Sequence, residues 1–374
     1  MKRLTCGIMA PQQETGRLPT PFKREGSESN IELEHLLRLM PASRRSKTVF
    51  HFNDRKSCPM DIVQRPKADV EFLAEELCVP SLNDIHDLLW LAGRPMPPRP
   101  LTYQLTASRT IAVVEDINLH LVWEPGRIFL KPIPRFLLNA AFWTKHLACD
   151  AAQDNSSCVS GVSRSAPSDP VSKRRELYGC AYGFLLSYTA LIQHESDYRI
   201  AASNHLLPAD VDWESWRQTS WELLENSPWN MTRVNKRYRY GELRLSRLNK
   251  ISRWRSLTCS GDGLVGLMRG YKFGFATYGQ LLEACLFPVV TATAYILLVL
   301  TAMQVGLSTD YLKDNFAFQQ ASWGFTVFSI LAPLILIVLS FVLVFLYVVF
   351  NYRSTKAFNQ RRMQFYDNLG RNGC

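Results

Sequence analysis

The stretch FTVFSILAPLILIVLSFVLVFLYVVF, residues 325–350, has no charged side chain in 26 residues. A helix of this length reaches about 39 Å at 1.5 Å per residue, and about 20 apolar residues already cross a bilayer core of roughly 30 Å. Its middle, residues 331–339, has no polar side that could face water in a soluble protein. The stretch therefore predicts a transmembrane helix rather than a helix buried in a soluble core.

A second apolar run, ACLFPVVTATAYILLVLTAMQV at residues 284–305, comes shortly before the first and also lacks charge. Its 22 residues would form a helix of about 33 Å. The connection between the runs, residues 306–324, is short and has Asp310, Lys313 and Asp314 as its charged residues. Two spans with so short a connection predict a C-terminal transmembrane hairpin.

Positive charge gathers in the two flanks of this hairpin. Residues 233–255 contain nine Lys or Arg and one acid, Glu242, whereas residues 353–371 contain five and one acid, Asp367. The two flanks, at +8 and +4, together exceed the +10 of the whole chain. Because Lys and Arg are enriched in cytoplasmic flanks, both termini are predicted to be cytosolic and the loop 306–324 non-cytosolic.

The N-terminal end agrees with a cytosolic domain. Met1, Lys2 and Arg3 are not followed by the 7 to 15 apolar residues that a secretory signal peptide contains. The nine cysteines show neither CxxC spacing nor a zinc-type Cys/His cluster, which favours reduced thiols.

Composition divides the remaining chain into an expected tail and an expected folded domain. Residues 1–66 are rich in Pro, Ser, Lys and Arg, which predicts a mostly disordered N-terminal tail. Residues 67–260 predict a cytosolic α-rich α+β domain, interrupted by a Ser-rich disordered insertion at about 150–172. A Gly-rich connector at 261–283 leads to the hairpin, and a basic cytosolic tail at 351–374 follows it.

Strands are expected only in a small part of the domain. Residues 110–114, 119–123 and 128–131 are short β-branched or apolar runs separated by acidic, Pro and Gly residues. This spacing predicts a small antiparallel β-meander.

Residues 177–193 form a third uncharged run, of 17 residues. Its length is at the lower limit for a membrane span, and it contains Tyr178, Tyr182, Ser187 and Tyr188. A buried core helix is therefore favoured over a third span.

A basic helix is predicted just before the hairpin, at about 240–257. In this segment apolar residues recur every third position, at Leu245, Leu248, Ile251 and Trp254, and cationic residues lie beside them. Such a helix suits the anionic cytoplasmic leaflet, and the alternative is a solvated stalk. The candidate anionic-lipid contacts are Arg244, Arg247, Lys250, Arg253 and Arg255. Nucleic acid is not expected as a partner, because the membrane flank already accounts for the charge.

Sequence motifs for catalysis are missing. There is no GxSxG elbow, HExxH helix, P-loop or EF-hand loop, and residues 261–266 match GxGxxG without the strand that a dinucleotide site requires. His194, Glu195 and Asp197 could form a polar site, but a polar helix end is the simpler interpretation, and Asp84, His86 and Asp87 are equally ambiguous. We therefore expect no enzyme, no cofactor and no assigned metal site.

Several stretches resemble an uncharacterised fungal family of two-span membrane proteins that carries a domain of unknown function. The resemblance rests on LHLVW at 119–123, IFLKPIPRFLL at 128–138, SYTALI at 187–192, YGELRLSRLN at 240–249, and the runs 293–306 and 317–333. It implies an architecture and a fungal origin, and it carries no activity with it.

The order of segments is also remotely similar to CorA-type divalent-cation channels, in which the first of two C-terminal spans lines the pore and ends in a Gly-Met-Asn motif. This chain lacks the motif. If a pore exists, its speculative lining residues are Thr291, Thr293, Thr301, Gln304 and Asp310. The alternative is that the threonines hydrogen-bond to their own helix backbone.

Two functions follow as hypotheses. The first is a non-enzymatic, membrane-anchored binding or organising protein with an unknown protein partner, in contact with the lipid bilayer and with anionic lipids. The second is a CorA-like homo-oligomeric cation channel or transporter, because two spans from one chain cannot enclose a conducting path.

Overall fold

The computed structural model describes residues 39–51, 57–66, 69–147, 170–225, 233–259, 270–272, 278–309 and 315–372. The chain divides into two compact units, residues 1–260 and 261–374. The predictions for residues 1–38, for most of the 150–172 insertion and for most of the Gly-rich connector fall outside the described residues. So do the 261–266 motif and Asp310.

Unit 1 combines short helices with two small sheets. Its strands are β1 (Arg44–His51), β2 (Ser57–Gln64), β3 (Thr110–Val113), β4 (Val122–Glu124), β5 (Arg127–Leu130) and β6 (Leu243–Arg244). Its α-helices are α2 (Val70–Leu77), α3 (Pro80–Asn83), α4 (Leu89–Ala92), α5 (Leu101–Thr106), α6 (Ala140–Phe142), α7 (Pro170–Leu191), α8 (Glu195–Ser203), α9 (Trp213–Glu225) and α11 (Leu245–Cys259).

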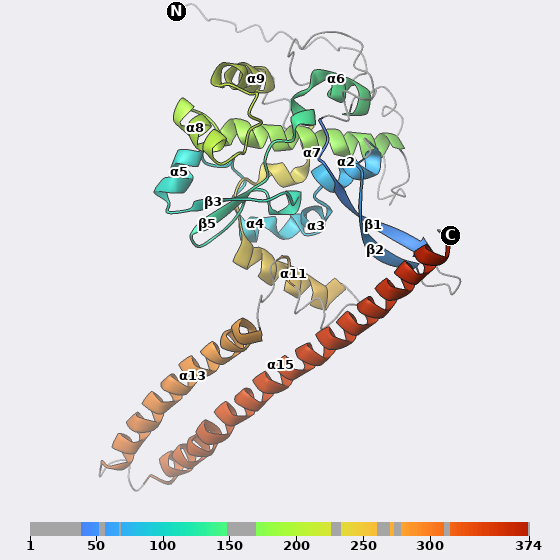
Figure 1. The fold of residues 1–374 in the computed structure, drawn as a ribbon. Helices are drawn as coiled ribbons and strands as arrows, with labels where there is room; N and C mark the ends of the chain where they lie inside the picture. Colours follow the sequence, from blue (N-terminus) through green and yellow to red (C-terminus); the bar gives the residue numbers. More distant parts are fainter. Residues whose placement is uncertain are drawn as a thin grey trace, which may run out of the picture. The chain divides into compact units, whose positions relative to one another are not determined.

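The helix α7 forms the centre of unit 1 (Figure 1). Its residues from Leu177 onward are buried almost all round, and it packs against α2, α9 and the segment 236–239. Glycine permits the closest of these contacts, because a Cβ at Gly183 would lie 2.4 Å from a ring carbon of Tyr238. The prediction of a buried core helix at 177–193 is confirmed, and α7 is not among the described helices that could span a membrane.

The larger sheet is mixed, so the predicted antiparallel meander is wrong. Its strand order is β3-β5-β4-β6, in which β5 and β4 are antiparallel while β3–β5 and β4–β6 are parallel. After β3 the chain passes through a 3-10 turn whose Ile117 and Leu119 are buried, and Leu121 then takes a φ of 62°. This detour leaves β3 beside β5 instead of β4, and β6 joins from a distant part of the sequence.

A two-stranded antiparallel sheet, β1–β2, lies within the segment predicted to be a mostly disordered tail. Its strands include TVF at 48–50 and DIV at 61–63, which favour extended structure. Arg44 at its start is buried, and its Nε donates to Glu75 Oε2 at 2.9 Å. The ion pair ties the sheet to α2, a contact that composition alone does not reveal.

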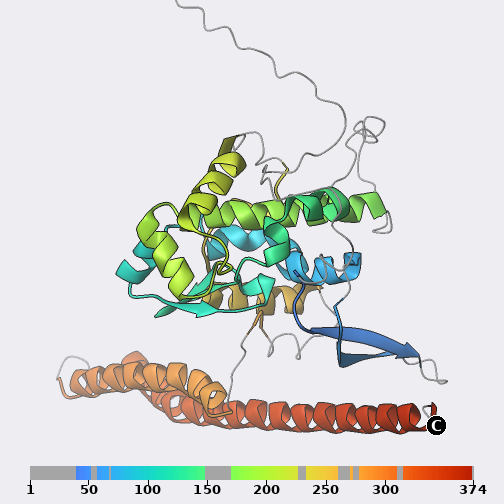
Figure 2. The same ribbon diagram turned by 45° about the horizontal axis from the view of Figure 1, so that its top comes forward.

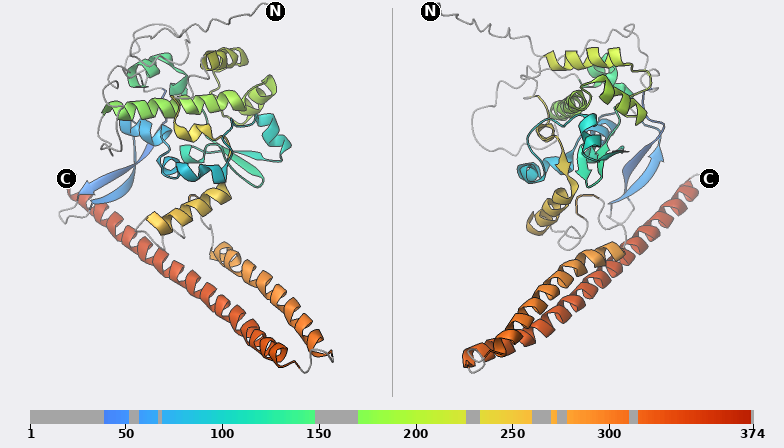
Figure 3. Two further views of the ribbon diagram at one scale, coloured as in Figure 1. Left: turned by 180° about the vertical axis from the view of Figure 1, so that it is seen from behind. Right: turned by 90° about the vertical axis from the view of Figure 1, so that its left-hand side faces the viewer.

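Unit 2 is a helical hairpin of α13 (Tyr278–Leu307) and α15 (Phe316–Asn372), which lie side by side in Figure 2. Leu286–Leu307 and Phe316–Gln364 are long and apolar enough to span a membrane, and only 6% of each tested window is buried. The predicted span cores, 284–305 and 325–350, lie within these helices. The predicted tail continues α15 as far as Asn372 (Figure 3). At 1.5 Å per residue, the 57 residues of α15 correspond to about 86 Å.

Small residues mark the contact between the two helices of the hairpin. Ser322, Ser329 and Ser340 are buried on α15, and Val289 is buried on α13. Small side chains allow apolar helices to approach closely. The hydroxyls of Ser329 and Ser340 bond within their own helix, donating to the carbonyl of Phe325 at 2.6 Å and to that of Leu336 at 2.8 Å.

Candidate functional site

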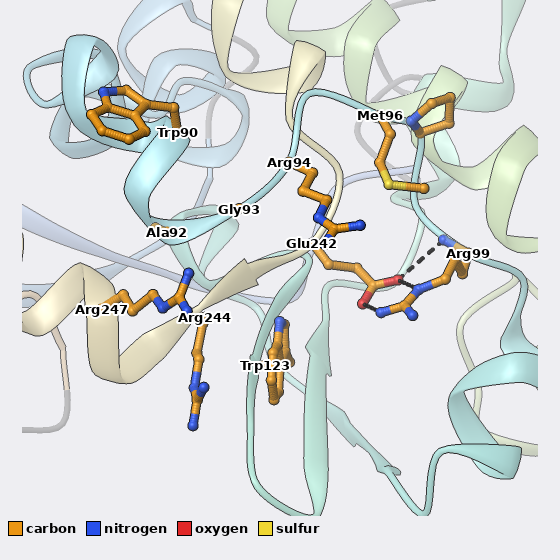
Figure 4. Close-up of a pocket in the computed structure, with 11 residues that line it drawn as sticks. Trp90, Ala92, Gly93, Arg94, Met96, Arg99, Trp123, Glu242, Arg244 and Arg247 are labelled. Carbon is orange, nitrogen blue, oxygen red and sulfur yellow. Dashed lines mark hydrogen bonds and ion pairs between the residues drawn. The ribbon is translucent and has the colours of Figure 1, made fainter.

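A cavity of about 530 Å³ opens in unit 1 where α4 and the proline loop after it meet β4, β6 and the start of α11. Four arginines line it, Arg94, Arg99, Arg244 and Arg247, together with a single acid, Glu242 (Figure 4). We call this cavity the arginine pocket. Its charged side chains come from segments that lie about 150 positions apart in the chain.

Two glycines allow these segments to cross at close range. A Cβ at Gly93 would lie 2.4 Å from the carbonyl oxygen of Glu242, and a Cβ at Gly241 would lie 2.6 Å from that of Met96. Any other side chain would push the proline loop away from β6. In the sequence, the two glycines are the feature that could have indicated a close approach between segments. The sequence does not show which segments approach each other.

The Glu242 carboxylate links the two segments that cross at these glycines, and its oxygens are occupied by hydrogen bonds. Its Oε1 accepts hydrogen bonds from Arg99 N, Arg99 Nε and Gln104 Nε2, and its Oε2 accepts from Arg99 Nη2 and Arg109 Nη1, both at 2.6 Å. Burial alone would raise the pKa of this carboxyl, but the bonds from Arg99, Gln104 and Arg109 outweigh it and lower the pKa to about 2. Glu242 therefore stays ionised and occupied at neutral pH.

The other arginines of the pocket are less committed. Arg247 donates one bond, from Nη1 to the carbonyl of Leu91 at 3.0 Å. The Arg244 guanidinium lies over the Trp123 ring at 5.2 Å, and its Nε is buried without a hydrogen-bond partner. Arg94 is exposed, and its guanidinium has no ion pair or hydrogen bond within the described residues. The pocket therefore presents donors that an anion can use.

Large apolar side chains stand exposed at the edge of the arginine pocket. Trp90, which lines it, is 62% exposed, Met96 is 44% exposed, and Leu91 beside them is 40% exposed. Further along α11, Trp254 is 58% exposed. Aromatic and cationic side chains together are typical of surfaces that meet a membrane interface.

The predicted basic helix is largely α11, and its apolar stripe serves the domain core. Leu245, Leu248 and Ile251 are buried within unit 1, so they are not available to a bilayer, and only Trp254 of the stripe is exposed. The sequence pattern predicts a basic amphipathic helix that meets either a bilayer or solvent, whereas the packing of α11 against α4 and β4 uses its apolar face.

The five candidate lipid contacts are therefore distributed over different environments. Arg244 and Arg247 line the arginine pocket, and Lys250 is exposed on α11. Arg253 and Arg255 are half-buried. The structure thus brings two of the five together, and it adds Arg94 and Arg99, which no sequence pattern marks.

The threonines proposed to line a pore are bonded to their own helix. The hydroxyls of Thr291, Thr293 and Thr301 donate to the carbonyls four residues earlier, at 3.0, 2.8 and 2.9 Å. At about 100° per residue, Thr291 lies about 160° around α13 from Thr293, so one helix face cannot present all of them. Gln304 is exposed, and Asp310 lies outside the described residues.

A polar network lies in the core of unit 1. His120 Nδ1 accepts from the backbone N–H of Lys131 at 3.2 Å, and Nε2 therefore carries the proton toward Ser187 Oγ at 2.9 Å. Burial, together with the charges of Arg237 and Lys131, holds the pKa of His120 well below its usual value. A neutral histidine that donates a hydrogen bond to serine cannot take the serine proton. The hydrogen bond between His120 and Ser187 therefore has a structural role.

The other polar candidates are helix caps or isolated groups. Asp197 is buried and accepts from the backbone N–H groups of Thr102, Gln193 and His194 at 2.8 to 3.2 Å, which confirms the polar helix end. His86 and Asp87 lie 3.8 Å apart. Within the described residues, no group of three or more His, Cys, Asp or Glu side chains is placed to hold a metal ion.

Fold and site together define a class of protein: a helix-rich domain with a small mixed sheet and an arginine pocket, carried on one chain with two helices apolar enough to span a membrane. A family of unknown function (DUF6601) matches residues 69–333, and the chain belongs to this family. The match includes the arginine pocket, α13 and the beginning of α15. No curated protein and no solved structure matches the chain.

Proposed function

We propose that this chain is an integral membrane protein that acts by binding and not by catalysis. The hairpin of α13 and α15 anchors it with both termini in the cytosol, and unit 1 holds an anionic partner in the arginine pocket. The observation that carries the proposal is the charge of the pocket, which is lined by four arginines and by one carboxylate that is already hydrogen-bonded by Arg99, Gln104 and Arg109.

The exposed surface of the hairpin supports the anchor. Side chains such as Phe287, Leu298, Ile335 and Phe345 are between 62% and 72% exposed. An apolar surface this continuous is costly in water and is covered by lipid in a bilayer. The basic flanks support cytosolic termini. Fungal origin and remote CorA likeness stay predictions.

The hydrogen bonds and protonation states of the titratable groups support binding over catalysis. Glu242 has a pKa of about 2 and all its strong acceptor positions in use, so it does not exchange a proton near neutral pH. His120 directs its proton toward Ser187, the reverse of what a serine nucleophile requires. The uncommitted groups of the pocket are guanidiniums, which bind anions and do not transfer protons.

The proposal predicts that a soluble polyanion stabilises unit 1. In full-length protein purified in nonionic detergent, pyrophosphate should raise the thermal unfolding midpoint, because a ligand that binds only the folded state stabilises it. The R94Q/R244Q variant should weaken binding about tenfold or more, since two charge-assisted donors are lost.

The control variant R199Q/R217Q removes two exposed arginines that pair with Glu195 and Glu214 on helix surfaces. It should respond to pyrophosphate as the unsubstituted protein does, and sodium chloride at equal ionic strength should give no comparable shift. An equal response of all three proteins, or no response in any of them, contradicts an anion site in the arginine pocket.

The cation-channel hypothesis stays a separate proposal, and a mass measurement discriminates it. Full-length protein in detergent, with the detergent mass subtracted, is expected to be smaller than a ring, because a membrane-anchored binding protein needs no pore around α13. A discrete ring-sized homo-oligomer would overturn this expectation and direct work to ion flux and to Gln304 and Asp310.

A further inference from the structure

We infer that the arginine pocket receives the phosphate monoester of a lipid headgroup at the membrane surface. This inference rests on the proposed function and specifies the ligand of the same site. Phosphate monoester is the chemistry that recognises the pocket, and the lipid is the source that the surroundings of the pocket favour.

The charge of the pocket fits a phosphate monoester better than a carboxylate. The negative charge of Glu242 is neutralised by its ion pair with Arg99. Three cations that line the pocket remain, Arg94, Arg244 and Arg247. A carboxylate or a phosphodiester brings one negative charge, whereas a monoester brings about 1.5 to 2 charges and three acceptor oxygens. Arginine's planar fork suits these oxygens, because it can donate two parallel bonds.

One hydrogen-bond donor of the pocket also lacks an acceptor. The buried Nε of Arg244 has no partner, and an unsatisfied buried donor costs free energy until an acceptor reaches it. The guanidinium is held over Trp123, which in turn stacks under Arg109 at 3.9 Å. In Figure 4, Arg94 extends from the proline loop toward Glu242, whereas Arg244 extends from β6 alongside Trp123. The site therefore combines a held guanidinium, Arg244, with an unpaired exposed one, Arg94, from separate elements.

The edge of the pocket distinguishes a lipid from a soluble phosphate compound. Trp90, Leu91 and Met96 are exposed beside the arginines, and a small soluble ligand would leave them in water. When the pocket faces a bilayer, these side chains enter the interfacial region, where tryptophan is favoured. Lys250 and Trp254 on α11 extend the same combination of positive charge and aromatic surface.

The volume of the arginine pocket and its covalent connection to the hairpin agree with a lipid headgroup as the ligand. The cavity, at about 530 Å³, falls in the usual range of ligand sites, about 300 to 1,000 Å³. The chain between Cys259 and Tyr278 extends to at most about 65 Å, so a membrane-inserted hairpin keeps the pocket at a high effective concentration of headgroups.

The test uses full-length protein in nanodiscs of phosphatidylcholine, with either phosphatidic acid or phosphatidylserine added to equal surface charge. Hydrogen exchange is followed at residues 90–99 and 242–247, and tryptophan quenching by brominated acyl chains reports insertion. Phosphatidic acid should slow exchange and increase quenching beyond phosphatidylserine. R94Q/R244Q should require about tenfold more phosphatidic acid for the same protection, while R199Q/R217Q should behave as the unsubstituted protein. Unchanged thermal midpoints verify that both variants fold.

A second arm adds glycerol 3-phosphate to nanodiscs of phosphatidylcholine alone. Weak protection in this arm supports the lipid source. If glycerol 3-phosphate protects as well as phosphatidic acid, the ligand is a soluble phosphate, and the inference fails while the proposed function stands. Equal protection by phosphatidylserine that the double substitution does not reduce indicates general surface attraction and overturns the headgroup site. If no anion, pyrophosphate included, protects the pocket, the proposed function fails as well.

Discussion

Replacing Glu242 by glutamine is expected to destabilise unit 1 by about 3 to 5 kcal/mol, the usual cost of removing one partner from a buried ion pair. The Glu242 side chain is 7% exposed, and the variant would leave Arg109, itself 10% exposed, without its anion. Arg99 would lose its bidentate partner, and the new amide would point a donor at a guanidinium. Hydrogen exchange of the α7 amides in full-length protein measures the change, because these amides open with the core.

The pH dependence of this variant gives a second signature. The pKa of Glu242 is lowered from 4.5 to about 2 by folding, so its contribution to stability is complete above 4.5 and is lost as the pH falls toward 2. E242Q should lack this acid-dependent loss. E195Q, which breaks the exposed pair of Glu195 with Arg199, should change stability by about 0.5 kcal/mol or less. If E242Q costs no more than E195Q, the network does not support the domain.

Lys131→Ala is expected to have a comparable effect, about 3 to 5 kcal/mol, from the lost ion pair and the cavity left behind. The Lys131 side chain is completely buried. Its ammonium lies 2.7 Å from Glu76 Oε2, 2.6 Å from the carbonyl oxygen of Glu115 and 3.4 Å from Glu115 Oε2. Urea unfolding of full-length protein in detergent, followed by exchange at α7, measures the loss.

A matched variant separates charge from volume at this position. Lys131→Met keeps most of the volume, and Glu76, which is 29% exposed, can return to water. We therefore expect K131M to recover at least half of the loss, because apolar replacement of a buried ion pair is often close to neutral. Exposed Lys145→Ala serves as the control, within about 0.5 kcal/mol. Equal losses in K131A and K131M would show that the charge itself is required.

Some elements could be predicted because their signals are local. The uncharged runs at 284–305 and 325–350 predicted long apolar helices, and the structure has α13 and α15 there. The uncharged but Tyr-rich run at 177–193 predicted a buried helix, and α7 is one. The tendency of an apolar segment to leave water depends on the composition of that segment. The residue order is therefore sufficient to predict such helices.

Other features depend on contacts between distant segments, and the predictions that needed them failed. Strand composition at 110–131 predicts a sheet region, and the structure has β3, β4 and β5 there. The neighbours of β5 and β4 are set by a buried 3-10 turn and by β6, which pairs Leu243 with Val122. The period of Leu245, Leu248 and Ile251 showed an apolar face without showing that unit 1 itself covers it. A pattern specifies that a face must be buried and does not specify by what.

Two apolar helices, the positive charge around them and the burial of α7 follow from the order of residues, because hydropathy and net charge are properties of contiguous residues. Which cations are paired depends on contacts between distant segments, and these exist only in the folded chain. Glu242 meets Arg99 and Arg109, which lie 143 and 133 positions away, whereas the buried Nε of Arg244 has no hydrogen-bond partner. A hydrogen bond needs its donor and acceptor within about 3 Å, so these pairings are fixed by where the chain crosses itself at Gly93 and Gly241.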